Sequence, residues 1–247
     1  MIHIRGLRKV FLPDTVALDD VSLDIAAGEF VMVIGQSGAG KTTLLRCLNR
    51  LVEPTAGEVF LNGSQVTGAS PDALRAARRQ IGMIFQQFNL VRRVSVLENV
   101  LAGRLGYVPA LTSLMGRFPR KDRDLARDCL RLVGLEEFAD RRADTLSGGE
   151  QQRVAIARAL AQEPKVILAD EPTASLDPKL TESIMSILQR INRERRLTLV
   201  VSQHMLDTAL TYGTRIVGLR KGRVAFDGPP GAMTPDRVAD IYEGGMR

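Results

Sequence analysis

Short apolar runs, separated by turns and by amphipathic segments, recur through most of the chain. In the first third, residues 2–4 and 21–25 alternate apolar and polar side chains, whereas Phe30–Ile34 is apolar throughout. Alternation predicts a strand with one buried face, and a short continuous run predicts a strand buried on both faces. The same criteria predict strands at residues 58–61 and 81–85.

Amphipathic helices are expected between and after these strands. Pro71–Arg79 reads as a helix, and so do residues 41–51, whose leucines share one face: Leu44, Leu45, Leu48 and Leu51. Later segments alternate in the same way, with helices at 149–161, 178–192 and 205–210, strands at 166–169 and 197–201, and a hairpin formed by 216–219 and 223–226. Strands that alternate with helices predict a mainly parallel sheet covered on both faces, which is an α/β fold.

The middle of the chain, from about residue 95 to residue 142, has helical periodicity instead. It also carries a cluster of basic residues: Arg117, Arg120, Lys121, Arg123 and Arg127. We expect a single domain over residues 1–247, in which residues 1–90 and 150–247 form the α/β core and about 91–149 is an inserted helical subdomain.

Composition narrows the classes of function. A hydrophobic fraction of 45% with 25% charged residues supports a packed core. Two cysteines cannot build a disulfide framework and suggest a reducing, cytosolic compartment. No apolar run approaches the ~20 residues of a membrane span, and the N-terminus lacks a signal-peptide pattern, so we expect a chain that is neither secreted nor membrane-spanning. The net charge of +6 indicates an anionic partner, and only 4% aromatic residues argue against base stacking on single strands.

A glycine-rich turn follows the buried run Phe30–Ile34. Its sequence fits G-x-x-x-x-G-K-[ST] and lies between a predicted strand and a predicted helix, as the motif requires. Glycines let backbone N–H groups point at phosphate oxygens, and the helix N-terminus adds its positive dipole end. The lysine can reach the β- and γ-phosphates, and the threonine hydroxyl can ligate Mg²⁺. The predicted nucleotide-binding residues are Gly35, Gln36, Ser37, Gly38, Ala39, Gly40, Lys41, Thr42 and Thr43.

A second apolar run, residues 166–169, ends in the two carboxylates Asp170 and Glu171. A buried parallel strand would carry them to the carboxyl edge of the sheet, where ligands bind in open α/β sheets. Asp170 is the candidate to hold Mg²⁺, and Glu171 is the candidate general base that polarises an attacking water. With the phosphate loop, this pair predicts a nucleoside triphosphate hydrolase.

A serine- and glycine-rich stretch lies upstream of the acidic strand: Leu146-Ser147-Gly148-Gly149-Glu150-Gln151-Gln152-Arg153. Taken alone it is a capped helix start, with Ser147 as the N-cap. Its sequence and its place before the acidic strand resemble the signature of the ATP-binding-cassette (ABC) family, although Glu150 stands where many members have glutamine.

Other ABC motifs follow in order. The run Phe85-Gln86-Gln87-Phe88 is similar to the Q-loop, with Gln86 preferred over Gln87 as the functional residue. Asp177 falls in a stretch that resembles the D-loop, and His204 resembles the switch histidine after the last core strand.

Two further positions complete the resemblance, which extends over nearly the whole chain. Phe11 occupies the place of the adenine-stacking aromatic, and Val16 is assigned to the nucleotide site. The resemblance implies a P-loop NTPase fold of the RecA-like type, with an N-terminal antiparallel β subdomain and an inserted helical subdomain.

The resemblance also implies a mechanism with ATP and Mg²⁺ as cofactors. Two cassettes would pair head to tail as a homodimer, with each ATP between one subunit's phosphate loop and the other's signature. Glu171 would be the general base, and His204 would hold the γ-phosphate and the water. Gln86 would reach the metal or that water. Asp177 would cross the interface, and the partner's ATP would meet the signature residues Ser147, Gly148, Gly149 and Glu150.

The class of transported solute rests on a finer resemblance. About a hundred residues separate Lys41 from Ser147, too few for the coiled coil of repair-type members. The segments 84–91 and 94–101 and the extra segment 111–123 are similar to the ATPases of phosphonate importers. Cassettes for lipoprotein release or export and for amino-acid import share much of this sequence, and a soluble nucleotide switch without transport is a remoter alternative.

A phosphonate importer implies several partners and a location. These are integral membrane permease subunits and, through the complex, a periplasmic solute-binding protein, with no nucleic acid. The cassette would lie at the cytoplasmic face of the inner membrane as a peripheral subunit. The basic cluster between Arg117 and Arg127 would face a permease or the anionic leaflet, or would be a solvated helix face.

Overall fold

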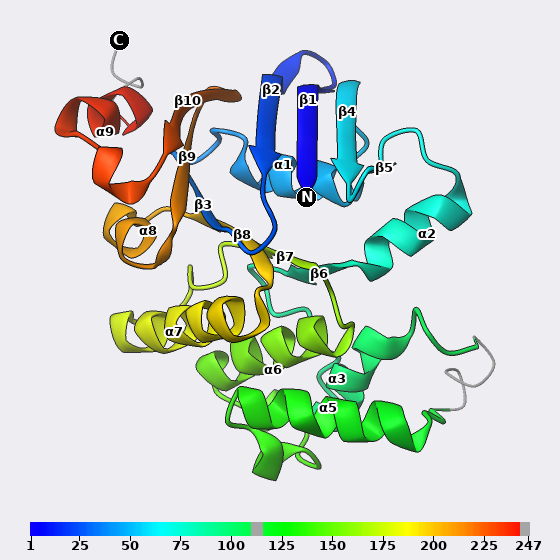
Figure 1. The fold of residues 1–247 in the computed structure, drawn as a ribbon. Helices are drawn as coiled ribbons and strands as arrows, with labels where there is room; N and C mark the ends of the chain where they lie inside the picture. The colour runs from blue at the N-terminus through cyan, green and yellow to red at the C-terminus, as the bar shows by residue number, and fades with distance from the viewer. Residues whose placement is uncertain (110–115, 243–247) are drawn as a thin grey trace.

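The computed structural model describes residues 1–109 and 116–242. Its strands form two sheets (Figure 1). The first is antiparallel, in the order β2 (Thr15–Ile25), β1 (Ile2–Phe11), β4 (Ala56–Leu61) and β5 (Ser64–Gln65). The second has the order β10 (Arg223–Gly228), β9 (Arg215–Arg220), β3 (Phe30–Ile34), β8 (Thr198–Gln203), β7 (Val166–Asp170) and β6 (Ile81–Ile84). Every pair in this second sheet is parallel except β10 with β9.

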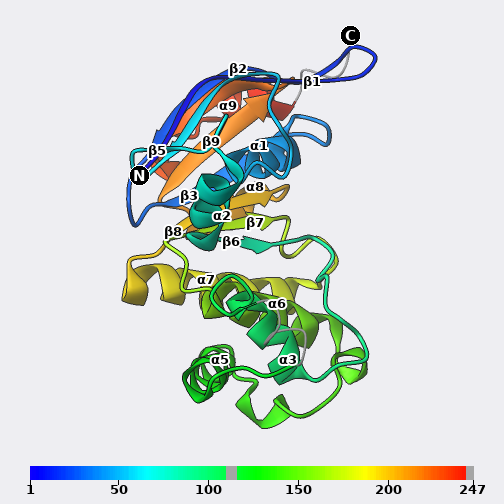
Figure 2. The same ribbon diagram turned by 90° about the vertical axis from the view of Figure 1, so that its right-hand side faces the viewer.

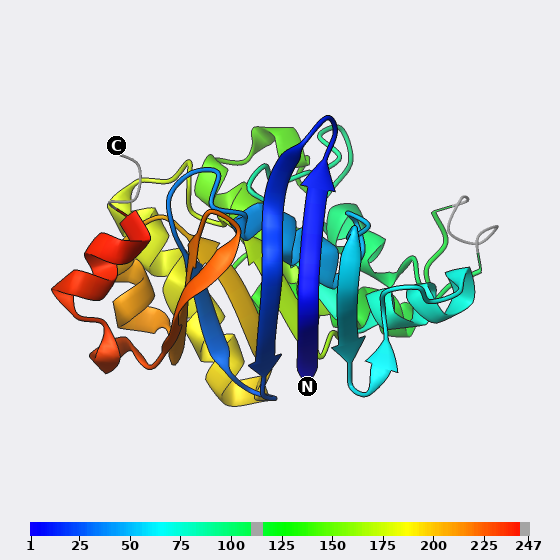
Figure 3. The same cartoon turned by 90° about the horizontal axis from the view of Figure 1, so that it is seen from above.

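Helices cover both faces of the six-stranded sheet. Figures 1 and 3 show α1 (Lys41–Leu48) between the two sheets, so that this helix separates them. Figure 2 shows α6 and α7 under the opposite face, with α3 and α5 farther from the sheet. The helices not yet given bounds are α2 (Pro71–Arg79), α3 (Val96–Leu101), α5 (Arg120–Leu132), α6 (Gly148–Ala161), α7 (Pro178–Arg195), α8 (Leu206–Tyr212) and α9 (Pro235–Tyr242). Short 3-10 helices are η1 (Ala102–Arg104), η2 (Glu136–Phe138), η3 (Ala143–Thr145) and η4 (Pro230–Ala232). This is the predicted α/β class with an antiparallel β subdomain.

The core lies on the two faces of β3, which explains its uninterrupted apolar sequence. Phe30, Met32 and Ile34 pack into the cluster that the helices below the sheet complete. Val31 and Val33 pack into the cluster shared with α1 and the antiparallel sheet. A strand buried on both faces needs apolar residues at every position.

The two cysteines also lie in these clusters. Cys47 and Cys129 are free and buried. Burial raises the pKa of each thiol to about 11, which leaves both protonated and unreactive at neutral pH.

Some predicted element boundaries were wrong. The helix predicted at residues 41–51 ends at Leu48, and Leu51 is half-exposed instead of continuing its buried face. The left-handed Arg50 follows the end of this helix, so the backbone cannot continue as a helix. Helix α9, which has no strong apolar run, had no sequence prediction.

The middle of the chain contains α3, η1 and α5, as the periodicity predicted. Residues 110–115, which include the first part of the extra segment 111–123, lie outside the described residues. Helix α5 carries four residues of the basic cluster: Arg120, Lys121, Arg123 and Arg127. In the described parts of the chain, no helix is both long and apolar enough to span a membrane.

Candidate functional site: a phosphate loop facing two carboxylates and a histidine

Three neighbouring parallel strands end at one edge of the sheet. Strand β3 pairs with β8, so that Ile34 lies beside Gln203, and β8 pairs with β7, so that Ser202 lies beside Asp170. The residues that follow each strand therefore meet at this carboxyl edge, where α/β sheets bind ligands.

The phosphate loop follows β3 and depends on its glycines. Gly35, Gly38 and Gly40 have φ of 150°, 79° and 104°, a region that side chains rarely adopt. A Cβ at Gly35 would lie 2.3 Å from the carbonyl oxygen of Leu219, and one at Gly40 would lie 2.4 Å from that of Ala17. The loop thus approaches neighbouring backbone too closely for any other residue, and α1 begins directly after it.

Lys41 is the first residue of α1, and its side chain turns back into the loop. Its Nζ donates to the carbonyl oxygens of Gly35 at 2.9 Å and Gln36 at 3.0 Å. The side chain is only 3% exposed. Burial lowers the pKa of Lys41, and the negative charges of Glu171 and Asp170 act in the opposite direction. The ammonium is therefore held beside the place where a loop-bound phosphate would lie.

Asp170, at the end of β7, is buried at 2% exposure and joins several groups. Its Oδ1 accepts from the Thr42 hydroxyl at 2.8 Å and from the Ser202 hydroxyl at 3.0 Å. Its Oδ2 lies 3.6 Å from the Arg46 guanidinium. A carboxylate beside a threonine hydroxyl is a pair of hard oxygen donors that suits Mg²⁺, which uses one or two carboxylates together with substrate phosphates. The described residues contain no group of three or more His, Cys, Asp and Glu side chains that could hold a metal alone, so phosphate oxygens would have to complete the site.

Glu171 and His204 form a close pair across the β7 and β8 ends. His204 Nε2 lies 2.5 Å from Glu171 Oε1, and the Lys41 Nζ lies 3.4 Å from His204 Nδ1. The neutral tautomer with its proton on Nε2 satisfies both contacts. The Glu171 carboxylate is 12% exposed and lies 3.9 Å from Lys41 Nζ. The candidate base Glu171, the Lys41 ammonium and the His204 imidazole therefore lie within contact distance of one another.

A hollow of about 600 Å³ surrounds these groups. It is lined by Phe11, Thr15, Ala17, Ser37, Gly38, Gly40, Lys41, Thr42, Thr43, Gln86, Glu171 and His204. Four of the predicted nucleotide residues do not line it: Val16, whose neighbours Thr15 and Ala17 do, and the loop residues Gly35, Gln36 and Ala39. Gln86 reaches this hollow and Gln87 does not.

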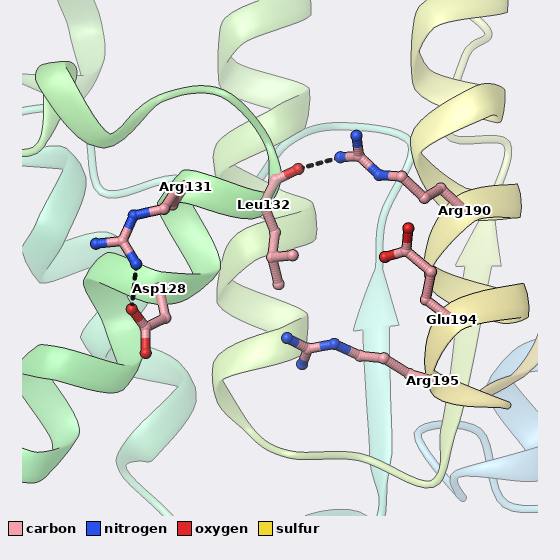
Figure 4. Close-up of a pocket in the computed structure, with 6 residues that line it drawn as sticks. All are labelled: Asp128, Arg131, Leu132, Arg190, Glu194 and Arg195. Carbon is pink, nitrogen blue, oxygen red and sulfur yellow. Dashed lines mark hydrogen bonds and ion pairs between the residues drawn. The ribbon is translucent and has the colours of Figure 1, made fainter.

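A second hollow, of about 450 Å³, lies between α5 and α7 (Figure 4). Charged side chains line it, and Arg190 of α7 donates there to the carbonyl oxygen of Leu132. None of the predicted site residues lines it. This second hollow therefore forms no part of the predicted site.

The signature begins helix α6, and it does not line the phosphate-loop hollow. Ser147 and Glu150 form a capping box: the Glu150 carboxylate accepts the Ser147 N–H at 2.7 Å, and the Ser147 hydroxyl accepts the Glu150 N–H. The Ser147 hydroxyl also donates to the Glu150 carboxylate at 2.7 Å, and this bond, together with the one from the Ser147 N–H, lowers the pKa of Glu150. A Cβ at Gly149 would lie 2.9 Å from Cδ2 of Leu180 in α7, so the Leu180 side chain would have to shift to admit it. Ser147 and Gly148 are exposed.

Two other predicted residues lie at exposed positions. Asp177 caps α7, where its carboxylate accepts the Leu180 N–H at 3.0 Å. Phe11, at the end of β1, is 40% exposed, and the Lys9 ammonium lies 4.9 Å from the centre of its ring. A partly exposed aromatic ring at the rim of the hollow is what a base would stack on.

Sequence reasoning missed three residues that touch this site. Arg46 and Ser202 contact Asp170, and the Tyr242 hydroxyl donates to the carbonyl oxygen of His204 at 3.2 Å. Arg46 could have been found from its spacing, because residues four apart share a helix face and Thr42 is a motif residue. Ser202 and Tyr242 carry no local signal, since their partners are distant in the sequence.

The fold and this site define a P-loop ATPase, and comparison with known families makes the class specific. A model of the ABC transporter family matches residues 18–174. The chain belongs to this family, and it is an ABC ATPase.

Curated relatives match nearly the full chain. It is 52% identical over 242 residues to the phosphonates import ATP-binding protein PhnC of Shouchella clausii, covering 98% of this chain and 91% of that protein. It is 49% identical over 244 residues to a protein called phosphonates import ATP-binding protein PhnC 1 of Ruegeria sp., covering 99% and 95%.

Solved structures agree on the fold. The ATP-binding cassette MJ0796, in a dimeric post-hydrolysis state bound to ADP and Pi, is 39% identical with a TM-score of 0.82, covering 93% of this chain and 99% of that one. A nucleotide-free ABC transporter cassette is 26% identical with the same TM-score of 0.82, covering 98% and 94%.

Proposed function

We propose that the chain is the ATP-hydrolysing subunit of an ABC importer that takes up phosphonate or a related phosphorus oxyanion across the inner membrane. The observation that carries this proposal is the identity of about half of all residues, over nearly the full length, to phosphonate-import ATPases. The site supports it, because Lys41, Glu171 and His204 converge beside a glycine loop that fits phosphates.

Each predicted residue then has a defined task. The loop N–H groups and Lys41 bind the β- and γ-phosphates, and the Phe11 ring stacks on the base. Thr42 and Asp170, with Gln86 at the rim of the hollow, hold Mg²⁺, which neutralises phosphate charge when bound. Glu171 accepts a proton from the attacking water. His204, whose Nε2 lies 2.5 Å from Glu171 Oε1, holds the γ-phosphate and the attacking water in place.

The signature takes its role from a second subunit. In one chain it does not line the phosphate-loop hollow, so it cannot bind the same ATP. A head-to-tail homodimer would present Ser147, Gly149 and the positive end of α6 to the γ-phosphate on the partner. Asp177, exposed at the start of α7, would lie at that interface.

The permease would dock at the groove beside the Q-loop. Two hollows of about 440 and 400 Å³ share Asn89 and flank the stretch from Phe85 to Asn89. Apolar residues are exposed there and nearby, with Leu51 50%, Val91 58% and Leu105 52% exposed. Such a surface fits an amphipathic helix of a membrane subunit. Gln86 would link this groove to the nucleotide, and the cassette would be a peripheral subunit on the cytoplasmic face, working with a periplasmic solute-binding protein.

The solute is tested by uptake in cells. A strain whose chromosomal copy carries Glu171→Gln should lose uptake of radiolabelled methylphosphonate, because import needs hydrolysis, and should keep uptake of amino acids. A matched strain with His3→Ala changes the only other histidine, which pairs with Asp24 on the surface, and should take up methylphosphonate normally. Normal methylphosphonate uptake with loss of amino-acid uptake would refute phosphonate as the solute.

A further inference from the structure

A single buried hydroxyl contacts both the carboxylate of Asp170 and the backbone of Glu171. Ser202 lies on β8, fully buried, and its hydroxyl donates to Asp170 Oδ1 at 3.0 Å. The Ser202 hydroxyl oxygen also accepts the backbone N–H of Glu171 at 2.9 Å. Ser202 thus contacts both the carboxylate assigned to Mg²⁺ and the backbone of the assigned general base.

The backbone of Glu171 needs such a restraint. Its φ of 46° places it in the left-handed region, which costs a non-glycine residue free energy and persists only where surrounding contacts enforce it. The bond to Ser202 fixes the N–H of this residue. It therefore helps to aim the Glu171 side chain toward His204 and Lys41.

Asp170 is restrained by the same contact. Its Oδ1 accepts from Ser202 on one side and from Thr42 on the other. Because Asp170 and Ser202 are direct neighbours in the β7–β8 register, the hydroxyl is set by the sheet and not by a mobile loop.

We propose that Ser202 is a positioning residue for ATP hydrolysis, which sets the orientation of Asp170 and Glu171 relative to each other without touching ATP. This inference rests on the proposed roles of those two carboxylates. Ser202 affects turnover and the use of Mg²⁺ and takes no part in nucleotide binding.

The chain offers a matched control on the same strand. Thr198 is also fully buried, it lies four residues before Ser202 on the same strand face, and its hydroxyl accepts the N–H of Gly28 at 2.9 Å. It lies at the opposite end of β8 from the site. Thr198→Val removes that hydroxyl at nearly constant volume, so it reports the effect of losing a buried hydrogen bond alone.

The experiment compares Ser202→Ala, Ser202→Thr, Thr198→Val and Glu171→Gln with the unchanged protein. We expect Ser202→Ala and Thr198→Val to lower the melting temperature. Of these two variants, only Ser202→Ala should lower kcat, by about tenfold or more, because a small misplacement of reacting groups has effects of that size. Its Kd for ATP without Mg²⁺ should stay within about twofold, and its half-saturating Mg²⁺ concentration should rise. Ser202→Thr, which keeps the hydroxyl, should recover most of the turnover.

The outcomes separate this inference from the proposed function. Equal kcat in Ser202→Ala and Thr198→Val would overturn the positioning role, while loss of turnover in Glu171→Gln would leave the proposed function standing. Turnover retained in Glu171→Gln would instead remove the proposed base. If Ser202→Ala does not fold, Ser202→Cys replaces it; a weakly bonding thiol should show the same fall in kcat, and full turnover would overturn the proposal.

Discussion

At the scale of single residues, His204 makes the shortest contact of the site. Its Nε2 lies 2.5 Å from Glu171, and its Nδ1 faces Lys41 at 3.4 Å. The imidazole therefore lies between the candidate base and the candidate phosphate-binding cation. It is half-open to solvent, with 41% of the side chain exposed, so that an incoming γ-phosphate can reach it.

His204→Ala should lower kcat by about 100-fold, which is within the range for a group that assists proton transfer. ATP binding, measured by fluorescence titration, should change little because Lys41 and the loop remain. His3→Ala is the matched control, since the chain has two histidines, and it should leave kcat unchanged. Equal turnover of the two variants would show that His204 has no catalytic part.

At the scale of elements, the N-terminal turn of helix α6 has two roles: it caps the helix, and it is proposed to meet the partner's ATP. The capping box of Ser147 and Glu150 stabilises the helix end. The same serine is predicted to meet the partner's ATP. Helix α3 has the same cap, in which Ser95 accepts the Glu98 N–H at 3.1 Å and the Glu98 carboxylate accepts the Ser95 N–H at 2.8 Å.

The two capping boxes allow the effect of losing a cap on stability to be measured separately from its effect on ATP hydrolysis. Ser147→Ala and Ser95→Ala should each reduce the free energy of unfolding by about 1 kcal/mol, the usual effect of losing an N-cap. Only Ser147→Ala should lose ATP hydrolysis as well, because only that cap is proposed to face a second subunit. Denaturant unfolding and steady-state ATPase assays measure the two effects. An active Ser147→Ala protein would argue against the signature role.

The sequence predicted the parts of this site that are local. The phosphate loop, the acidic strand end and the capped signature each depend on neighbouring residues, and apolar runs such as Phe30–Ile34 predicted the buried strands. Boundaries were less predictable: Leu51 has helical spacing, yet the chain turns before it at a left-handed Arg50. The contacts of Ser202 and Tyr242 depend on strand order and on α9, which periodicity does not encode.

In the proposed dimer, each whole molecule would supply half of each of two ATP sites. The phosphate loop, Asp170 and Glu171 lie at one edge of the six-stranded sheet, while the signature begins α6 below the sheet (Figure 2). Two chains must meet for a loop and a signature to enclose one nucleotide. In the proposed mechanism, ATP would stabilise the dimer and hydrolysis would remove the contacts that hold it, which would turn chemistry into motion of the attached permease.

The most direct test of this account is the oligomeric state of Glu171→Gln with ATP and Mg²⁺, measured by analytical ultracentrifugation alongside its ATPase rate. The account predicts a stable ATP-bound dimer with turnover reduced by about 100-fold or more, because nucleotide binds but the proton acceptor is missing. Without ATP the same variant should be monomeric. Near-normal turnover, or a protein that remains monomeric with ATP bound, would contradict it.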